Sequence, residues 1–349
     1  MTGCRDVRAL PKAHLHLHLV GGMRPATLAA LAARYRVGLP AALSGPVRSG
    51  SGIALPATAP SGWFRFQRIY DAARSVLRTA DDVHRVITEI AEDEVADGSV
   101  WVELQVDPSG YAQRLGGLVG AVEVLVSAVD AAAAATGIGM ALIIAANRTR
   151  HPLDAATLAR LAVRNAGNGV VGFGLSNDER RGPAGEFVKA FRIARAGGLL
   201  AVPHGGETAG ATSVRDCVTL LGAHRVGHGV RAVDDPAVLG LLADRRVCCE
   251  VSITSNVALG VAATAAAVPV RRLLEAGVPV ALGADDPLLF GGRLAVQYEL
   301  ARRELGLDDA ALADLARCSV HASSAPPEIR RSALADIDEW LAASPPPLA

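Results

Sequence analysis

Eight short runs of aliphatic and β-branched residues recur along the 349-residue chain, and each is followed by a stretch of helical character. Most are continuously apolar rather than alternating, as expected of strands buried on both faces. They lie at residues 13–19, 100–106, 139–146, 170–176, 199–205, 225–230, 248–254 and 279–285. This order predicts an α/β fold, a (β/α)₈ TIM barrel formed as a single domain over residues 1–349. Counting alone leaves an open parallel sheet as the alternative.

Helical patterns fill the intervals between these strands. The clearest are residues 81–97, 118–135, 186–196 and 268–276. Additional helices are expected after the first strand, and residues 43–62, rich in Gly, Ser, Pro and Ala, are interpreted as a long loop there. Beyond it, Trp63, Phe66 and Tyr70 share one helical face. That stripe indicates either core packing or a lid over a planar ligand.

Charge and cysteine content exclude several classes of protein. Lys plus Arg and Asp plus Glu each number 35, so no basic surplus exists to bind nucleic acid. The apolar stretch 120–135 contains Glu123 and Asp130, and charged residues interrupt the first 20 positions, so neither a membrane span nor a signal peptide is expected. The five cysteines show no C-x-x-C spacing, which is typical of a reduced, cytoplasmic protein.

Three histidines, His14, His16 and His18, alternate along the first strand. Residues two apart on a strand project to the same side, so we expect all three to face the barrel interior. Three buried imidazoles in one strand would each need a polar partner. A bound metal ion would satisfy this need for adjacent histidines.

Further polar residues follow other strands. His204 and Glu207 lie in PHGGE, His228 in GHG, and Asp285 and Asp286 in GADDP. Active sites of barrels lie at the carboxyl ends of the strands, and small neighbouring residues leave room there for a ligand. We therefore expect these side chains to converge on one site.

The donor set suits zinc, which prefers imidazole nitrogen and carboxylate oxygen and keeps one position open for water in catalytic sites. The sequence predicts one Zn²⁺ per chain, because the fourth strand has no Lys to bridge two metals. The predicted ligands are His16, His18, His204 and Asp285. Zinc makes water a nucleophile near neutral pH.

The remaining polar groups divide the chemistry between them. His228 is expected to orient the attacking water and take up its proton, and Glu207 to protonate the group under attack. Asp286 is expected to anchor the substrate. The other zinc deaminase signature, H-x-E with P-C-x-x-C, is absent from the sequence.

From Pro11 to about Ala325 the chain resembles the adenosine/adenine deaminase family of the amidohydrolase superfamily. The matching segments, in the family's order, are PKAHLHLHLVGG, VVGFGLSNDE, PHGGE, RVGHG, TSN and LGADDPLLFG. The resemblance implies the same four zinc ligands. It also implies that Glu207 protonates purine N1, His228 acts on the water and Asp286 bonds N7. Hydroxide would add at C6, and ammonia would leave.

Three departures from the family pattern concern the substrate. Val20 stands where adenosine-specific relatives place an Asp on the ribose. Asn177 stands where many relatives have a Gly that contacts purine N3, although Asn tolerates left-handed geometry. Ser252-Ile253 replaces Cys-Pro.

The predicted reaction is deamination of adenosine to inosine, with a small purine nucleoside as the only partner; the oligomeric state is left open. An apolar Val20 beside the sugar favours, as the first alternative, a 5′-modified adenosine such as 5′-deoxyadenosine, methylthioadenosine or aminodeoxyfutalosine. Free adenine is the next alternative. A non-catalytic nucleoside-binding barrel would have no use for both Glu207 and His228.

Overall fold

The computed structural model describes residues 4–44 and 60–344. Eight parallel strands pair in chain order, which confirms the predicted barrel. They are β1 (Lys12–His18), β2 (Ser99–Val106), β3 (Gly139–Asn147), β4 (Val170–Ser176), β5 (Leu200–Gly205), β6 (Arg225–His228), β7 (Cys248–Val251) and β8 (Val280–Leu282). The first and last strands meet through Asp285, whose N–H donates to the His16 carbonyl (3.0 Å) and whose carbonyl accepts from the His18 N–H (3.0 Å).

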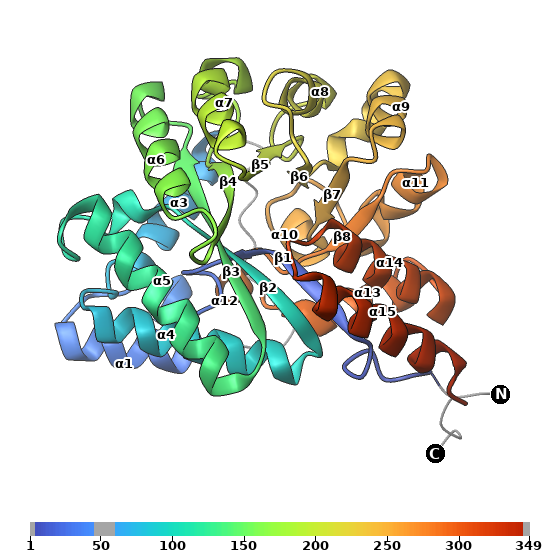
Figure 1. Cartoon of the computed structure of the whole chain (residues 1–349), viewed down its shortest axis with the longest axis horizontal. Helices are drawn as coiled ribbons and strands as arrows, with labels where there is room; N and C mark the ends of the chain where they lie inside the picture. Colours follow the sequence, from blue (N-terminus) through green and yellow to red (C-terminus); the bar gives the residue numbers. More distant parts are fainter. Residues whose placement is uncertain (1–3, 45–59, 345–349) are drawn as a thin grey trace.

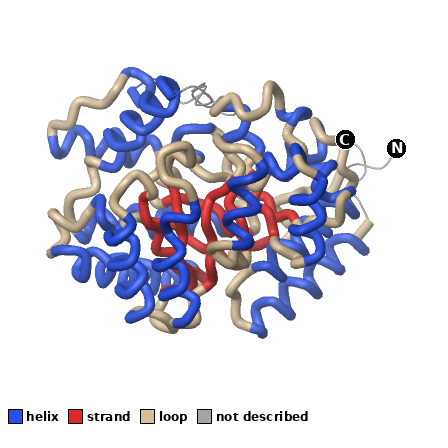
Figure 2. Tube along the Cα trace, turned by 90° about the horizontal axis from the view of Figure 1, so that it is seen from above, coloured by secondary structure: helices blue, strands red, loops and turns tan. Residues whose placement is uncertain are grey.

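The helices surround the strands, and in Figure 1 the outer ones follow one another around the barrel in chain order: α4, α5, α6, α7, α8, α9, α11 and α14. Their bounds are α1 (Pro25–Tyr35), α2 (Ala41–Ser44), α3 (Pro60–Arg74), α4 (Ala80–Ala96), α5 (Gly117–Thr136), α6 (Pro152–Arg164), α7 (Val188–Ala196), α8 (Ala211–Thr219), α9 (Pro236–Asp244), α10 (Ile253–Ala258), α11 (Val270–Glu275), α12 (Pro287–Phe290), α13 (Leu294–Arg303), α14 (Asp309–Ala322) and α15 (Pro327–Ala342). Seen from above, the strands lie at the centre of the molecule and the helices outside them (Figure 2). Because every strand runs the same way, their carboxyl ends gather at one end of the barrel.

The helices α1 to α4 lie between β1 and β2, as expected for additional helices after the first strand. The predicted loop at 43–62 is wrong at both ends. Leu43 belongs to α2, and α3 begins at Pro60, since a Pro suits the first turn of a helix. The rest of that prediction, residues 45–59, lies outside the described residues.

One described helix, α5, is long and apolar enough to span a membrane by length and composition alone. It packs against α4 and β3. Leu125 and Val129 are among its buried side chains, whereas Glu123 and Asp130 are exposed. In this structure α5 therefore serves as one of the helices that cover the barrel.

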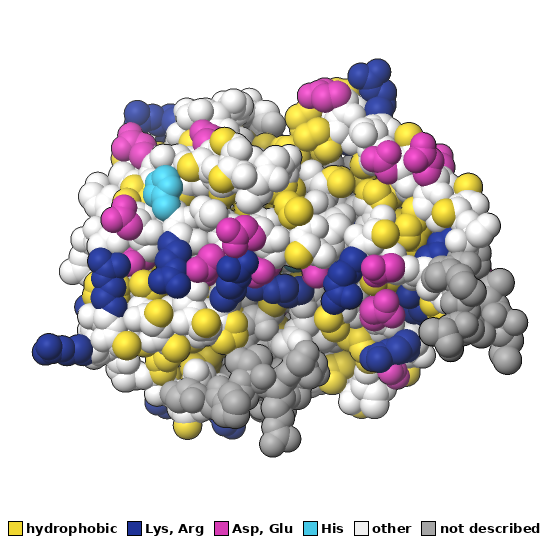
Figure 3. All heavy atoms as spheres, turned by 90° about the horizontal axis from the view of Figure 1, so that it is seen from below, with side chains coloured by type: hydrophobic (Ala, Val, Ile, Leu, Met, Phe, Trp, Pro, Cys, Tyr) yellow, Lys and Arg dark blue, Asp and Glu magenta, His cyan; other side chains and the backbone are white. Residues whose placement is uncertain are grey.

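The surface carries both signs of charge. On the face shown in Figure 3, basic and acidic side chains lie beside one another rather than in separate patches. Among the ion pairs of the described residues, Arg24 pairs with Glu92 (2.8 Å) and Asp93 (2.9 Å). This face thus reflects the balanced charge of the sequence.

Candidate active site

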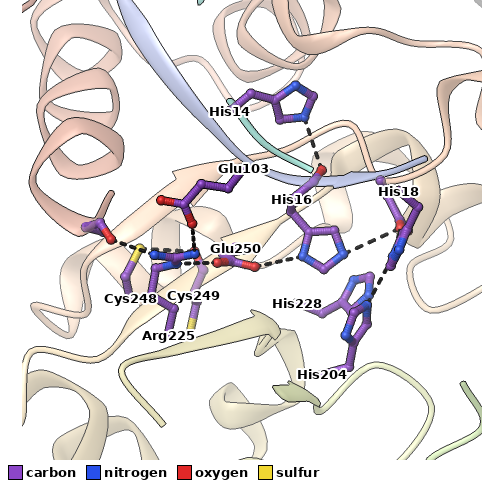
Figure 4. A network of polar contacts seen from close by, with 12 residues as sticks. His14, His16, His18, Glu103, His204, Arg225, His228, Cys248, Cys249 and Glu250 are labelled. Carbon is purple, nitrogen blue, oxygen red and sulfur yellow. Dashed lines mark hydrogen bonds and ion pairs between the residues drawn. The ribbon is translucent and has the colours of Figure 1, made fainter. Parts of the chain in front are cut away.

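The histidines of β1 do not all point the same way. His16 and His18 turn toward His204 and His228, whereas His14 lies on the other side of the strand (Figure 4). His14 Nδ1 lies 2.9 Å from a carboxylate oxygen of Glu94 on α4. The prediction that all three share one side is wrong for His14, because the pairing of β1 with β2 shifts register between His14 and Leu17.

Four ligand-type side chains converge where β1, β5 and β8 end. His18 Nε2 lies 3.3 Å from His204 Nε2 and 3.2 Å from Asp285 Oδ1. His16 Nε2 is buried without a hydrogen-bond partner, and its distance to Asp285 Oδ1 is 3.5 Å. Ligands about 2.0–2.2 Å from a tetrahedral zinc lie about 3.3 Å from one another. The cluster therefore has the spacing of a metal site, and these four residues could hold the ion.

His228 lies close to this cluster as well. Its ring nitrogen, a His16 nitrogen and an Asp285 oxygen all lie within 4.8 Å of one another. Both His228 (φ 64°) and Asp285 (φ 61°) adopt the left-handed backbone conformation, which is uncommon outside glycine. Such geometry is often found at functional sites, where the surrounding fold imposes it.

Glycines leave the space that His16 occupies. A Cβ on Gly227 would lie 2.8 Å from His16 Cε1, and a Cβ on Gly283 would lie 2.7 Å from His16 Cβ. The small residues that flank the strand-end His and Asp residues thus make room for a neighbouring imidazole.

A chain of buried charges holds His16 from the opposite side (Figure 4). The Nδ1 of His16 lies 2.8 Å from Glu250 Oε2, and Arg225 Nε donates to Glu250 Oε1 at 2.6 Å. Arg225 also pairs with Glu103 through a very short contact. When Nδ1 donates to a carboxylate, Nε2 is left with its lone pair, which is the form that binds a metal.

Asp285 has its own supporting group. Ser255 Oγ, at the start of α10, donates to Asp285 Oδ2 at 2.6 Å. Sequence reasoning singled out the TSN segment but gave Ser255 no role, and it missed Glu250 and Arg225. A single acid in the apolar strand β7 (CCEV) was the available signal.

The pKa values describe a site that attracts positive charge. Burial lowers the pKa of His16, but the nearby carboxylates of Asp285 and Glu250 outweigh it and raise the pKa to about 10. Burial raises the pKa of Asp285, yet the nearby imidazoles of His16 and His18 bring it well below its usual value. The two buried carboxylates beside His16 thus favour a positive charge at this position.

Glu207 and His228 face each other, with Glu207 Oε1 3.5 Å from His228 Nε2. Burial, and then the charges of Asp285 and Glu179, raise the pKa of Glu207 well above its usual value. Burial lowers the pKa of His228 to about 4. The arrangement therefore places an acid whose protonated form is favoured beside a base whose neutral form is favoured.

Asp286 lines the same cavity, and burial together with the Asp285 charge raises its pKa well above the usual range. Gly21 leaves room for it, since a Cβ there would lie 2.0 Å from Asp286 Oδ1. The neighbouring Val20 is fully buried in the hydrophobic core and is not among the residues that line the cavity. The structure therefore brings Asp286, but not Val20, to the cavity.

Helix α3 covers the cavity. Its lining residues are Trp63, Phe66, Gln67, Tyr70 and Arg74. The Phe66 ring also stacks on Phe290 with a centroid distance of 5.7 Å. The aromatic stripe thus packs against the barrel and lines the cavity at once.

Asn177, directly after β4, attaches helix α3 to the barrel. Its Oδ1 accepts from Trp63 Nε1 (3.2 Å), and its Nδ2 donates to Gln67 Oε1 (2.9 Å). Asn177 has φ 82°, in line with the left-handed tolerance that the sequence suggested.

Sequence reasoning missed polar residues on the far side of the cavity. Asp107, Asn147 and Ser176 end or follow β2, β3 and β4, and Tyr111 lies just beyond β2; all four line the cavity. Asp107, Asn147 and Ser176 obey the strand-end rule that singled out His204 and Asp285.

Comparison with known proteins then assigns the family. Residues 11–340 match the adenosine deaminase family. The chain belongs to this family. A Streptomyces coelicolor relative named "Putative adenosine/adenine deaminase" is 60% identical, over 98% of this chain and 100% of its own. An adenine deaminase of Rhizobium leguminosarum is 35% identical, over 93% and 98%.

A solved structure extends the comparison to the fold. An amidohydrolase from Burkholderia ambifaria with bound Zn superposes with a TM-score of 0.83 at 26% identity, covering 97% of this chain and 93% of its own. Together with the family match, this makes the chain a hydrolase that deaminates an adenine-type substrate, with a His/Asp cluster compatible with a metal.

Proposed function

We propose that this deaminase converts adenosine to inosine and ammonia with one zinc ion per chain. The observation that carries the proposal is the convergence of His18, His204 and Asp285, at 3.2–3.3 Å, in a cavity that Glu207 and Asp286 also line. A binding protein would gain nothing from a buried acid and base beside such a cluster.

His16, His18, His204 and Asp285 would hold the ion. The orphaned Nε2 of His16 supports this, because a buried polar atom without a partner is costly. The bound ion would supply a Lewis acid that activates water as the nucleophile. Zinc rather than another metal is favoured by the three imidazoles with one carboxylate.

Glu207 would give its proton to N1 of the purine, which makes C6 more electrophilic. The raised pKa favours the protonated form of Glu207. His228, neutral because burial lowers its pKa, would accept the proton of the attacking water. The departing amino group then leaves as ammonia after a second proton transfer.

Asp286 would bond N7, which in a 9-substituted purine is only an acceptor. A carboxyl can donate to it only when protonated, and the raised pKa of Asp286 favours this form. Asn177 would contact the substrate edge from the end of β4, beside the aromatic residues of α3.

The sugar distinguishes two candidate substrates. Asp107, Asn147 and Ser176 extend the polar lining beyond the acid and base and offer partners for ribose hydroxyls, which favours adenosine. Adenine is the second candidate. The small volume of the cavity, about 80 Å³, favours this smaller substrate.

An ammonia-release assay on the metal-loaded protein separates these possibilities. The panel is adenosine, 5′-deoxyadenosine, methylthioadenosine, aminodeoxyfutalosine and adenine. We expect the highest kcat/KM with adenosine. A hundredfold preference for adenine would overturn the nucleoside assignment and leave the deaminase assignment intact. The highest kcat/KM with a 5′-modified nucleoside would instead identify a 5′-modified adenosine as the substrate.

The cytoplasm is the proposed location, with the purine substrate as the partner. All five cysteines are free, as reduced thiols in the cytoplasm would be. Recovery of the activity in the membrane fraction of lysed cells would contradict this.

A further inference from the structure

Glu179 is a buried carboxylate that the proposed chemistry does not use. It comes shortly after β4 and is 4% exposed. One oxygen accepts from the backbone N–H of Glu207 (2.7 Å) and Thr208 (2.8 Å). The other accepts from the N–H of Gly206 (2.8 Å) and from Ser213 Oγ (2.5 Å). All of these donors belong to the turn after β5 or to helix α8.

The turn is shaped to receive an anion. Gly206 has φ 71°, and a Cβ there would lie 2.3 Å from Val214 Cγ2, so only glycine fits. A left-handed residue followed by a turn makes successive N–H groups converge into a concave anion site. Here the chain's own Glu179 fills that site, with charge-assisted hydrogen bonds that are stronger than neutral ones.

Arg148 holds the other end of the same segment. Its Nη2 donates to the His204 carbonyl at 2.5 Å, and its side chain is buried. Burial raises the pKa of Glu179, but the Arg148 charge and the hydrogen bonds of the turn outweigh it, so the pKa stays below its usual value. The stretch from His204 to Thr208 is thus fixed at both ends by buried, opposite charges.

The hydrogen bonds to Glu179 matter because the pairing of β5 with β6 ends before it reaches Glu207. The pairing of β5 with β6 stops at Gly205, opposite His228, and Glu207 lies beyond it. Within the described part of the chain no strand pairing reaches Glu207, and the preceding Gly206 carbonyl accepts from the Arg231 N–H outside the strands (3.1 Å). Its own N–H instead donates to Glu179.

We propose that Glu179 is a positioning residue that aims the Glu207 carboxyl at the substrate. The inference rests on the proposed role of Glu207 as the acid. A displacement of about 1 Å in a catalytic group can cost about a hundredfold in rate. Glu179 would thus contribute to turnover without contacting the substrate.

The test is a double-mutant cycle with Glu179→Gln and Glu207→Gln. An amide cannot accept from both sets of donors, so Glu179→Gln should lower kcat about a hundredfold, with KM little changed and one metal per chain retained. In the Glu207→Gln background, Glu179→Gln should cause almost no further loss, because the group it positions is already disabled. Glu179→Asp keeps the charge but is shorter, so it should recover part of the rate.

Asp178→Asn is the matched control. It removes a neighbouring buried carboxylate that bonds to Arg180 (2.8 Å), and wild-type kcat is expected. Equal losses from Glu179→Gln in both backgrounds, or wild-type kcat in Glu179→Gln, would overturn the positioning role. If Glu179→Gln does not fold, the same cycle is run with Glu179→Asp. Wild-type kcat in Glu207→Gln would instead overturn the acid assignment of the proposed function.

Discussion

The floor and the roof of the cavity are built in different ways. The floor, His16 with Glu250, Arg225 and Glu103, consists of fully buried charged groups on four different strands, each paired with the next. The roof, helix α3, is amphipathic and carries exposed residues such as Arg65 and Arg68 on its outer side. Two hydrogen bonds fasten it to the barrel: Asn177 accepts one from Trp63 and donates the other to Gln67.

The difference indicates which part of the site determines metal binding and turnover and which part determines substrate affinity. Removing one member of a buried charge network leaves another unpaired, which costs far more than the loss of an exposed contact. The floor is therefore expected to fix the metal and the turnover, and the roof to fix affinity and substrate choice. Substitutions in each part of the site test this division.

The largest loss of kcat is expected from a substitution of Glu207, which belongs to neither the floor nor the roof. Glu207→Gln keeps the shape of the side chain but removes the proton donor, so kcat should fall by about 10²–10⁴-fold. Steady-state kinetics and metal analysis should show unchanged metal content. Near-normal kcat would mean that another group is the acid.

A smaller loss is expected at the floor. In Glu250→Gln the amide cannot serve both His16 Nδ1 and Arg225, so zinc affinity should fall by about 10–100-fold. Competition with a chromogenic chelator measures this directly. Glu103→Gln, one step farther from His16, is the control and should change zinc affinity less. Equal effects of the two variants would contradict the ordered network.

The roof should respond in KM rather than kcat. Asn177→Gly accepts the left-handed backbone but loses the bonds to Trp63 and Gln67, so KM should rise about fivefold or more. Trp63→Phe loses only one of the two bonds and keeps an aromatic ring, so its KM should rise less. A fall in metal content in either variant would show that roof and floor are not separate.

The smallest effect is expected at Val20. Because its side chain lies in the core, Val20→Thr should change the ratio of kcat/KM for adenosine and 5′-deoxyadenosine by less than about twofold, although a buried hydroxyl costs about 1–3 kcal/mol of stability. Parallel assays with the two nucleosides measure the ratio. A tenfold shift would show that Val20 contacts the substrate.

The strands and the strand-end residues could be predicted because both depend on local pattern and on the common direction of the strands. His14 could not, since its orientation depends on a register shift between β1 and β2. The partnership of Glu250 with His16 depends on which strands become neighbours across the barrel. The role of Glu179 depends on the conformation of a turn that follows another strand. The single-domain organisation and the substrate contacts stay predictions.

The hydrogen bonds that join β8 to β1 involve the backbone of His16, His18 and Asp285. An ion held by the side chains of these residues would fasten the first strand of the chain to the last, as a cross-link does. Binding to the folded state alone stabilises it by RT ln(1 + [L]/Kd), about 2.7 kcal/mol at a hundredfold excess over Kd. Metal supply would then govern the stability of the folded barrel in the cell as well as its catalysis. Metal depletion would first weaken the contact between β1 and β8.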